Sequence, residues 1–279
     1  MSPEQALDPG LRSVPVRRRG VRLEQDLVVV EEPLEIRVNG KPLVVTMRTP
    51  GHDDELAAGF LWAEGVVTKP GEIISMHASS GTGDSGTQIR VTEFSGDRID
   101  VTLPASTSAD DERAVRSAER EFRATAACGV CGKSEIDDLQ QDLPTITRVE
   151  AQTALLEQLP DRLRQAQQLF DATGGIHAAG LFDLEGQLLC AREDIGRHNA
   201  VDKVIGHSVR LNAVPLTDRI LVVSGRAGFE LVQKALKAAI PVMVSVGAAS
   251  SLAVSMATDA GMALYSFAGP GRGNLHVKA

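Results

Sequence analysis

Two of the three cysteines in this chain stand three residues apart, at Cys128 and Cys131, within the stretch RATAACGVCGKSE. The thiolate is the reactive form of cysteine, and the positive charge of Lys133 would favour it. The flanking glycines leave both sulfurs sterically open and permit unusual backbone angles. Three kinds of chemistry fit such a pair: a dithiol redox couple, half of a zinc site, or a persulfide carrier. The charged, glycine-rich setting disfavours inert burial of two small apolar side chains.

The zinc and redox alternatives have requirements that the sequence meets poorly. A structural zinc site needs four ligands, and Cys190 with a histidine would have to complete it. However, the alternation in QLLCARE assigns Cys190 to the apolar face of a strand. A deaminase zinc site needs His-x-Glu and a proline before the first cysteine, but the chain has no His-x-Glu, and Ala127 precedes Cys128. A thioredoxin-like pair would follow a strand rather than a charged helix. We therefore expect no bound metal.

A second concentration of polar residues lies in CAREDIGRHNAVDKVIG, where a strand is predicted to lead into a helix. His198 and Asp202 are four residues apart, so they would share a helix face and could form a hydrogen bond. A capped, salt-bridged helix start would explain part of this pattern. The excess of polar groups favours a binding site, with His198 as a candidate. The polar residues are Arg192, Glu193, Asp194, Arg197, His198, Asn199, Asp202 and Lys203.

Two further strand-to-helix junctions are rich in glycine and serine. LVVSGRAGFE contains Ser224, Gly225 and Arg226, and VSVGAASSLA contains Gly247 and Ser250. Free backbone N–H groups and the positive end of the helix dipole make such junctions natural anion sites. Ligands of open parallel sheets gather at the carboxyl ends of the strands, and the guanidinium of Arg226 adds a phosphate donor. Ordinary tight turns would also need small residues, but two such junctions in one sheet favour an anionic ligand.

The C-terminal segment is basic and rich in glycine. It follows the last predicted strand, MALYSF, and reads SFAGPGRGNLHVKA. No strand, turn and helix follow its glycines, so it is not a dinucleotide-binding fingerprint of the Rossmann type. Two interpretations remain equal on the sequence: a flexible segment that folds over an anionic ligand, or a frayed chain end.

Composition excludes several classes of function. Hydrophobic residues make up 43% of the chain, enough for a sizeable core. A net charge of -8 and 3% aromatic residues argue against a basic or base-stacking nucleic-acid surface. No apolar run reaches the length of a membrane span, and the polar N-terminus lacks a signal-peptide core. Three cysteines are too few for a disulfide scaffold. We expect a cytoplasmic protein that binds neither nucleic acid nor membrane.

Strand and helix patterns predict how the candidate residues are positioned. Alternating apolar runs on either side of Asn39-Gly40 predict a β-hairpin. Towards the C-terminus, buried strands alternate with amphipathic helices, which predicts a layered α/β domain with a partly parallel sheet. The predicted division is a flexible N-terminal tail (residues 1–20), an α+β subdomain (21–107), a charged helix with a mobile cysteine-pair loop (108–145) and an α/β cofactor-binding domain (146–279).

Taken together, these segments resemble the formate dehydrogenase accessory sulfurtransferases, the FdhD family. The string EDIGRHNAVDKVIG is the most specific part of the resemblance. The other matching segments are TPGHDDELAAGFLWAEGV, ACGVCGK, TGGIHAAGLFD, SGRAGFELVQKA and SLAVSMA, in this order along the chain. The resemblance implies a cytidine-deaminase-like layered α/β core without the zinc site, a smaller N-terminal α+β subdomain, and a homodimer.

The resemblance also implies an activity. Family members pass persulfide sulfur from a cysteine desulfurase to the molybdenum cofactor in its bis-guanine-dinucleotide form, which formate dehydrogenase requires. By motif match, Cys128 carries the sulfur and Cys131 assists. The segment that matches the family's cofactor-binding region is Phe267, Ala268, Gly269, Pro270, Gly271 and Arg272. Guanine nucleotides are then expected to bind as mimics of the cofactor. Two rival functions stay open: a zinc-dependent hydrolase of deaminase-like fold, and a non-catalytic chaperone of the molybdenum cofactor.

Overall fold

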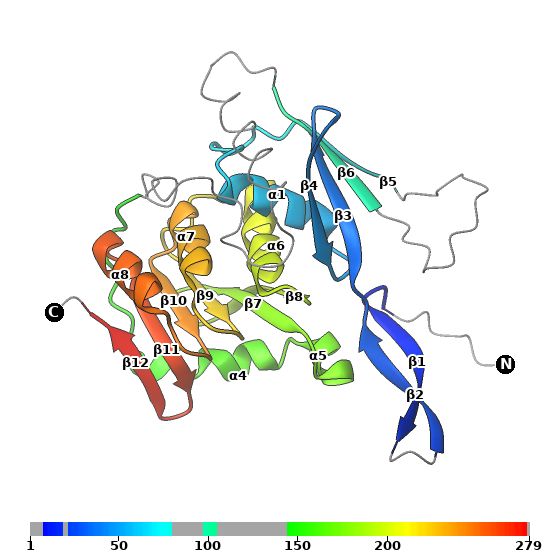
Figure 1. Cartoon of the computed structure of the whole chain (residues 1–279). Coiled ribbons are helices and arrows are strands. Elements are labelled where there is room, and N and C mark those ends of the chain that lie inside the picture. The colour runs from blue at the N-terminus through cyan, green and yellow to red at the C-terminus, as the bar shows by residue number, and fades with distance from the viewer. Residues whose placement is uncertain (1–7, 19–21, 80–96, 105–143, 278–279) are drawn as a thin grey trace.

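The computed structural model describes residues 8–18, 22–79, 97–104 and 144–277 (Figure 1). Both cysteines of the pair, and the charged segment before them, lie outside the described residues. The fold is mixed α/β, as predicted, with a large sheet, a small sheet and a two-stranded ribbon. Within the described ranges, no helix has both the length and the apolar character needed to cross a membrane.

Six strands form the large sheet. They are β7 (His177–Phe182), β8 (Leu188–Asp194), β9 (Ile220–Val223), β10 (Val242–Ser245), β11 (Ala263–Gly269) and β12 (Arg272–His276). Their order across the sheet is β12-β11-β10-β9-β7-β8, and β9, β10 and β11 are parallel. β9 and β10 are almost entirely apolar and are buried over their whole length, as expected of strands covered on both faces.

Helices cover both faces of this sheet. On one face lie α6 (Arg197–Arg210), α7 (Phe229–Lys237) and α8 (Ser251–Ala260), and on the other α3 (Thr153–Leu156), α4 (Leu159–Arg164) and α5 (Gln168–Thr173) (Figure 1). Alternate residues of β9 serve the two layers because successive strand side chains point to opposite faces. Leu221 packs in the cluster that includes α6 and α7, whereas Val222 packs with α3 and α4.

The N-terminal unit is built on the small sheet. Its elements are β3 (Glu32–Val38), β4 (Lys41–Arg48), α1 (Asp53–Ala63), β5 (Ser75–Ser79) and β6 (Asp97–Thr102), and its strand order is β4-β3-β6-β5. Asn39 and Gly40 both have positive φ in the turn between β3 and β4. This geometry is the hairpin turn that Asn-Gly favours, so the hairpin prediction is confirmed.

Helix α1 joins the small sheet to the large one by crossing α6 at two glycines. An added Cβ at Gly59 would collide with the carbonyl oxygen of Asp202, and one at Gly206 would collide with that of Glu55. The two helix backbones therefore touch, with no room for a side chain between them. The indole of Trp62 strengthens the attachment by donating a hydrogen bond of 3.0 Å to the carbonyl oxygen of Lys237 on α7.

The structure corrects two predictions about the chain ends. The sequence predicts a flexible tail over residues 1–20, but Leu11–Arg18 form β1, which pairs antiparallel with β2 (Arg22–Val29). The many arginines of this segment concealed its strand character. The sequence also predicts an irregular segment after MALYSF, but β11 continues to Gly269 and the chain returns as β12. Gly273 makes this return possible, because a Cβ there would collide with the ring of Tyr265.

Candidate functional site

The two glycine-rich junctions meet at the carboxyl edge of the parallel strands. Gly247 donates its N–H to the carbonyl oxygen of Gly225 at 3.0 Å, and Phe267 donates to that of Gly247 at 3.1 Å. The hydroxyl of Ser245 lies 2.9 Å from both of these carbonyl oxygens. The loops that follow β9 and β10 and the end of β11 are therefore tied into one surface, in keeping with the predicted parallel sheet.

Three of the predicted binding residues have backbone or side-chain groups that are already hydrogen-bonded within the fold. The amide of Gly247 is already hydrogen-bonded, and a Cβ there would lie 3.0 Å from the Cα of Arg226. Ser224 exchanges hydrogen bonds with Ala178, through its amide at 3.0 Å and its hydroxyl at 2.9 Å. Ser250 caps α8 by accepting a bond from the Ala253 amide at 3.3 Å. The N–H of Gly247 is thus already bonded to Gly225, and a role of Gly247 in binding stays a prediction.

Two arginines and a histidine converge on the same edge. Arg226 is exposed beside Gly225. A Cβ on Gly225 would lie 3.5 Å from Nδ1 of His177 and 3.9 Å from Cδ of Arg197. These three side chains come from the start of β7, the start of α6 and the loop after β9. The carboxyl edge therefore gathers two arginines and a histidine from three separate segments of the chain.

His198 is at this edge but already has an anionic partner. Its Nε2 lies 2.7 Å from a carboxylate oxygen of Glu230, in the first turn of α7. Burial alone would raise the pKa of Glu230, but the hydrogen bond and charge of His198 more than offset it and lower that pKa. The predicted bond between His198 and Asp202 is not formed, because Asp202 binds Lys234 at 2.7 Å instead.

His177 was not among the predicted site residues. Its pKa is lowered, first by partial burial and then by the positive charges of Arg197, His198 and Arg226. The sequence carried little signal for it, because its position depends on the antiparallel pairing of β7 with β9. Only that pairing brings the first residue of β7 to the carboxyl edge of the parallel strands.

Most polar residues of CAREDIGRHNAVDKVIG have structural roles. Asp194 and Lys203 form a buried ion pair with an N–O distance of 2.7 Å. Asp194 also accepts bonds from the amide of Thr49 at 3.1 Å and from Asn199 at 3.0 Å. Glu193 accepts bonds from two backbone amides at the start of α5. The segment thus attaches β8 and α6 to the N-terminal unit. Fewer of its polar residues are available to bind a ligand than the sequence alone indicated.

The segment from Phe267 to Arg272 forms the tip of the β11–β12 hairpin. Phe267 has a positive φ, and 47% of its surface is exposed at the carboxyl edge. Ala268 and Gly269 are buried, whereas Pro270, Gly271 and Arg272 are exposed at the turn. Because β11 is parallel to β9 and β10, this tip extends from the same edge that carries Arg226.

Cys190 lies in β8 and is 6% exposed. Burial raises the pKa of its thiol to about 11, so the thiolate is strongly disfavoured at neutral pH. Among the described residues, no group of three His, Cys, Asp or Glu side chains could hold a metal ion. Cys190 therefore behaves as the packed strand residue that the alternation of QLLCARE indicates.

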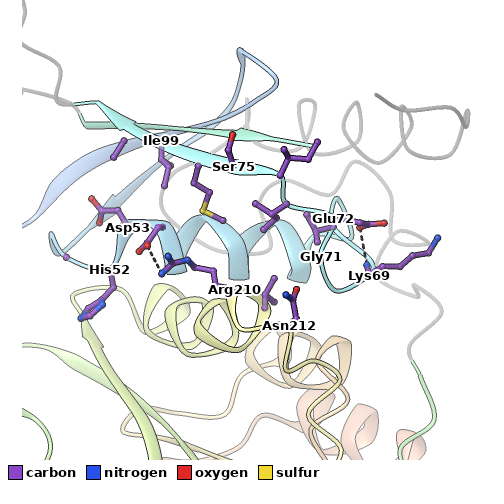
Figure 2. A pocket seen from close by; sticks show the side chains of 17 residues that line it. His52, Asp53, Lys69, Gly71, Glu72, Ser75, Ile99, Arg210 and Asn212 are labelled. Carbon is purple, nitrogen blue, oxygen red and sulfur yellow. Dashed lines mark hydrogen bonds and ion pairs between the residues drawn. The ribbon is translucent and has the colours of Figure 1, made fainter. Parts of the chain in front are cut away.

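A cavity of about 670 Å³ lies away from this edge, between α1 and the small sheet (Figure 2). Arg210 reaches from the end of α6 to Asp54, with an N–O distance of 2.6 Å. Glu72 accepts a hydrogen bond from the amide of Lys69 at 3.0 Å. None of the predicted site residues lines the cavity. Arg210 and Asp54 neutralise each other, and the carboxylate of Glu72 is bonded to backbone amides, so these groups indicate no class of ligand.

Comparison with known proteins agrees with the sequence motifs and the fold. A protein called sulfur carrier protein FdhD from Streptomyces avermitilis is 45% identical over 261 residues, which cover 90% of this chain and 87% of that protein. A protein of the same name from Corynebacterium efficiens is 47% identical over 257 residues, 91% of this chain and 89% of that protein.

A solved structure and a family model match nearly the whole chain. The crystal structure of a putative formate dehydrogenase accessory protein from Desulfotalea psychrophila has the same fold, with a TM-score of 0.69 and 24% identity over 95% of both chains. The model of the FdhD/NarQ family matches residues 29–278. With relatives of this similarity over most of its length, the chain belongs to the FdhD/NarQ family.

Proposed function

We propose that this protein is a sulfurtransferase that carries persulfide sulfur from a cysteine desulfurase to the molybdenum cofactor, in its bis-guanine-dinucleotide form, for formate dehydrogenase. Membership of a family whose relatives are called sulfur carrier proteins supports the carrier role. The observation that carries the choice of substrate is the cationic carboxyl edge, because the cofactor is a large anion with pyrophosphate groups. Action in the cytoplasm and as a homodimer are further parts of the proposal.

Cys128 is the proposed carrier. Its thiolate attacks the outer sulfur of the desulfurase persulfide, so that a new S–S bond forms while the desulfurase cysteine leaves as a thiolate. Attack of Cys131 on the inner sulfur of Cys128 then releases hydrosulfide towards the cofactor. This second step leaves a disulfide between the two cysteines, which a cellular dithiol reduces before the next cycle.

The carboxyl edge is the proposed binding site for the nucleotide portions of the cofactor. Arg226 is an exposed guanidinium, and no hydrogen bond or ion pair joins it to another described residue. Phe267 offers an exposed aromatic ring on the neighbouring strand. A pyrophosphate on the arginine and a guanine ring near the phenylalanine would use both features. A non-catalytic chaperone of the cofactor would need the same surface. Formation of a persulfide on the protein distinguishes a sulfur carrier from such a chaperone.

Replacing Arg226 with alanine is expected to weaken GDP binding about ten- to hundredfold, as for loss of a hydrogen bond to a charged group. Binding to the wild type should weaken as salt rises, because the contact is largely ionic at an open site. Calorimetry with GDP measures both effects. Arg98→Ala is the matched control, since Arg98 is an exposed arginine of the small sheet paired with Glu35 at 2.9 Å. If the wild type and Arg226→Ala bind GDP with equal affinity, the carboxyl edge is not the nucleotide site.

Replacing Cys190 with alanine is expected to cost about 1 kcal/mol of unfolding free energy, the scale of a small core truncation. Sulfur transfer should continue at the wild-type rate, because the buried thiol has no access to substrate. Urea denaturation and a transfer assay on the same preparation test the two statements. A folded Cys190→Ala protein with no transfer activity would instead indicate a site that uses all three cysteines.

A further inference from the structure

We propose that His177 and Arg197 form, with Arg226, an oxyanion site in which a phosphate group and a proton on His177 bind together. The inference rests on the proposed function for the identity of the ligand, a pyrophosphate diester of a guanine nucleoside. It adds two residues to the site and makes substrate binding dependent on pH.

The three side chains of the proposed site lie around Gly225. The ring of His177 lies close to it, since a Cβ there would be in van der Waals contact, 3.5 Å from Nδ1 and 3.6 Å from Cε1 of His177. The same Cβ would lie 3.9 Å from Cδ of Arg197. Arg226 follows directly in the chain, and its Cα and Cγ pack against Gly247. A phosphate bound over Gly225 at this surface would have an imidazole and two guanidinium groups as donors.

Charges around this surface are not balanced within the described part of the chain. The side chain of His198 is paired with Glu230, with an N–O distance of 2.7 Å. The carboxylate of Asp194 is paired with Lys203, also with an N–O distance of 2.7 Å. The guanidinium groups of Arg197 and Arg226 form no hydrogen bond or ion pair with another described residue, although the charge of Arg197 helps to lower the pKa of Glu230. Two guanidinium groups beside a half-buried histidine favour the binding of an anion between them.

The state of His177 then depends on whether the anion is bound. Groups that face it are Asp194 from β8, Arg197 and His198 from α6, and Arg226 from the loop after β9; of these only Asp194 is anionic. Without ligand, burial and the nearby cations lower the pKa of His177, so the ring is neutral at pH 7. A bound phosphate reverses the local charge and raises that pKa. Binding therefore takes up protons, and affinity increases as pH falls through the pKa of the bound state towards that of the free state.

A merely structural histidine would behave differently. No described residue forms a hydrogen bond with the ring of His177, so the fold does not fix its protonation state. If the ring only filled space, its replacement would change stability but not the pH dependence of ligand binding. The pH dependence is therefore the readout that separates the two roles.

The test uses the full-length protein and GDP-mannose, whose diphosphate is a diester and has no proton to gain or lose near neutral pH. Calorimetry at pH ~6 and ~8 should show affinity about three- to tenfold higher at the lower pH, since one pKa unit corresponds to a factor of ten. The binding heat near pH ~6.5 should also differ between buffers of different ionisation enthalpy, which reports proton uptake.

Variants then assign the effect to residues. His177→Asn should remove the pH dependence and the buffer-dependent heat, and Arg197→Gln should lower affinity about tenfold at both pH values. Arg98→Gln, with the same loss of charge on the small sheet, should bind as the wild type does. If His177→Asn does not fold, the buffer-dependent heat of the wild type still decides proton uptake.

Two results would overturn the inference: pH-independent binding by the wild type, or unchanged binding by folded His177→Asn and Arg197→Gln proteins. Absence of GDP-mannose binding at millimolar concentration would overturn it as well. None of these outcomes touches the carrier function, because persulfide formation on Cys128 is measured without any nucleotide. Conversely, if the protein binds GDP-mannose with proton uptake but gains no sulfur, the oxyanion site is supported and the proposed carrier function is contradicted.

Discussion

Sulfur transfer stops when Cys128 is replaced by alanine, and it slows without stopping when Cys131 is replaced. This is the expected result because Cys128 would hold the sulfur, whereas an external thiol can take over the releasing role of Cys131. The assay follows labelled sulfur from cysteine, through a desulfurase, to the molybdenum cofactor, and then measures formate dehydrogenase activity. Cys190→Ala is the matched control, as it removes a thiol without touching the pair.

A different outcome would change the mechanism. Normal transfer by the Cys128→Ala protein would show that the sulfur travels on another group. Equal and complete loss in both single variants would indicate that the two cysteines act as one unit, as in a metal site or an obligatory disulfide cycle. Each variant must first show the same cooperative unfolding as the wild type, so that loss of activity is not loss of fold.

Replacing Gly206 with alanine is expected to destabilise the protein by at least about 3 kcal/mol, the upper end of the range for overpacking a tight contact. On an isolated helix this change would be favourable by about 1 kcal/mol. Here the new Cβ would collide with the carbonyl oxygen of Glu55 and the amide nitrogen of Gly59, which are backbone atoms that cannot rotate away. Helix α1 would have to move off α6 and carry the small sheet with it.

Urea denaturation measures this loss as a lower midpoint. Gly175→Ala is the control, because its Cβ would lie 3.9 Å from the carbonyl oxygen of Thr173, an ordinary contact. That change should alter the unfolding free energy by less than about 0.5 kcal/mol. A Gly206→Ala protein as stable as the wild type would mean that α1 and α6 do not touch as described.

Local signals in the sequence predicted the parts of the fold that depend on neighbouring residues. The positive φ values of Asn39 and Gly40 follow from the preference of this dipeptide for hairpin turns. The alternation of buried strands with helices predicted a layered α/β domain with a partly parallel sheet, and β9, β10 and β11 are parallel. These elements brought Gly225 and Gly247 together at one edge, as the rule for parallel sheets requires.

Features that depend on distant partners were not predictable in the same way. Strand β12 forms because β11 offers an open edge and Gly273 fits against Tyr265, and neither fact is visible in the glycine-rich segment alone. His177 reaches the candidate site only through the pairing of β7 with β9. Sequence spacing linked His198 to Asp202, but Lys234 from another helix is the partner that the fold supplies.

The most specific string of the sequence, EDIGRHNAVDKVIG, illustrates the limit of motif reasoning. Its buried pair of Asp194 and Lys203 also contacts Thr49, through the amide and the carbonyl oxygen of that residue. The string therefore fastens the N-terminal unit to the large sheet, and it contributes Arg197 and His198 to the carboxyl edge. A dense motif can identify a family while most of its polar residues serve the fold.

Mass spectrometry of the protein after incubation with a cysteine desulfurase and cysteine tests the carrier function most directly. We expect a gain of one sulfur atom, about 32 daltons, on the peptide that contains Cys128, and its loss on treatment with a reducing thiol. The Cys128→Ala protein should show no such gain. A wild-type protein that stays unmodified while the desulfurase turns over, or that gains sulfur only on another residue, would contradict the central claim.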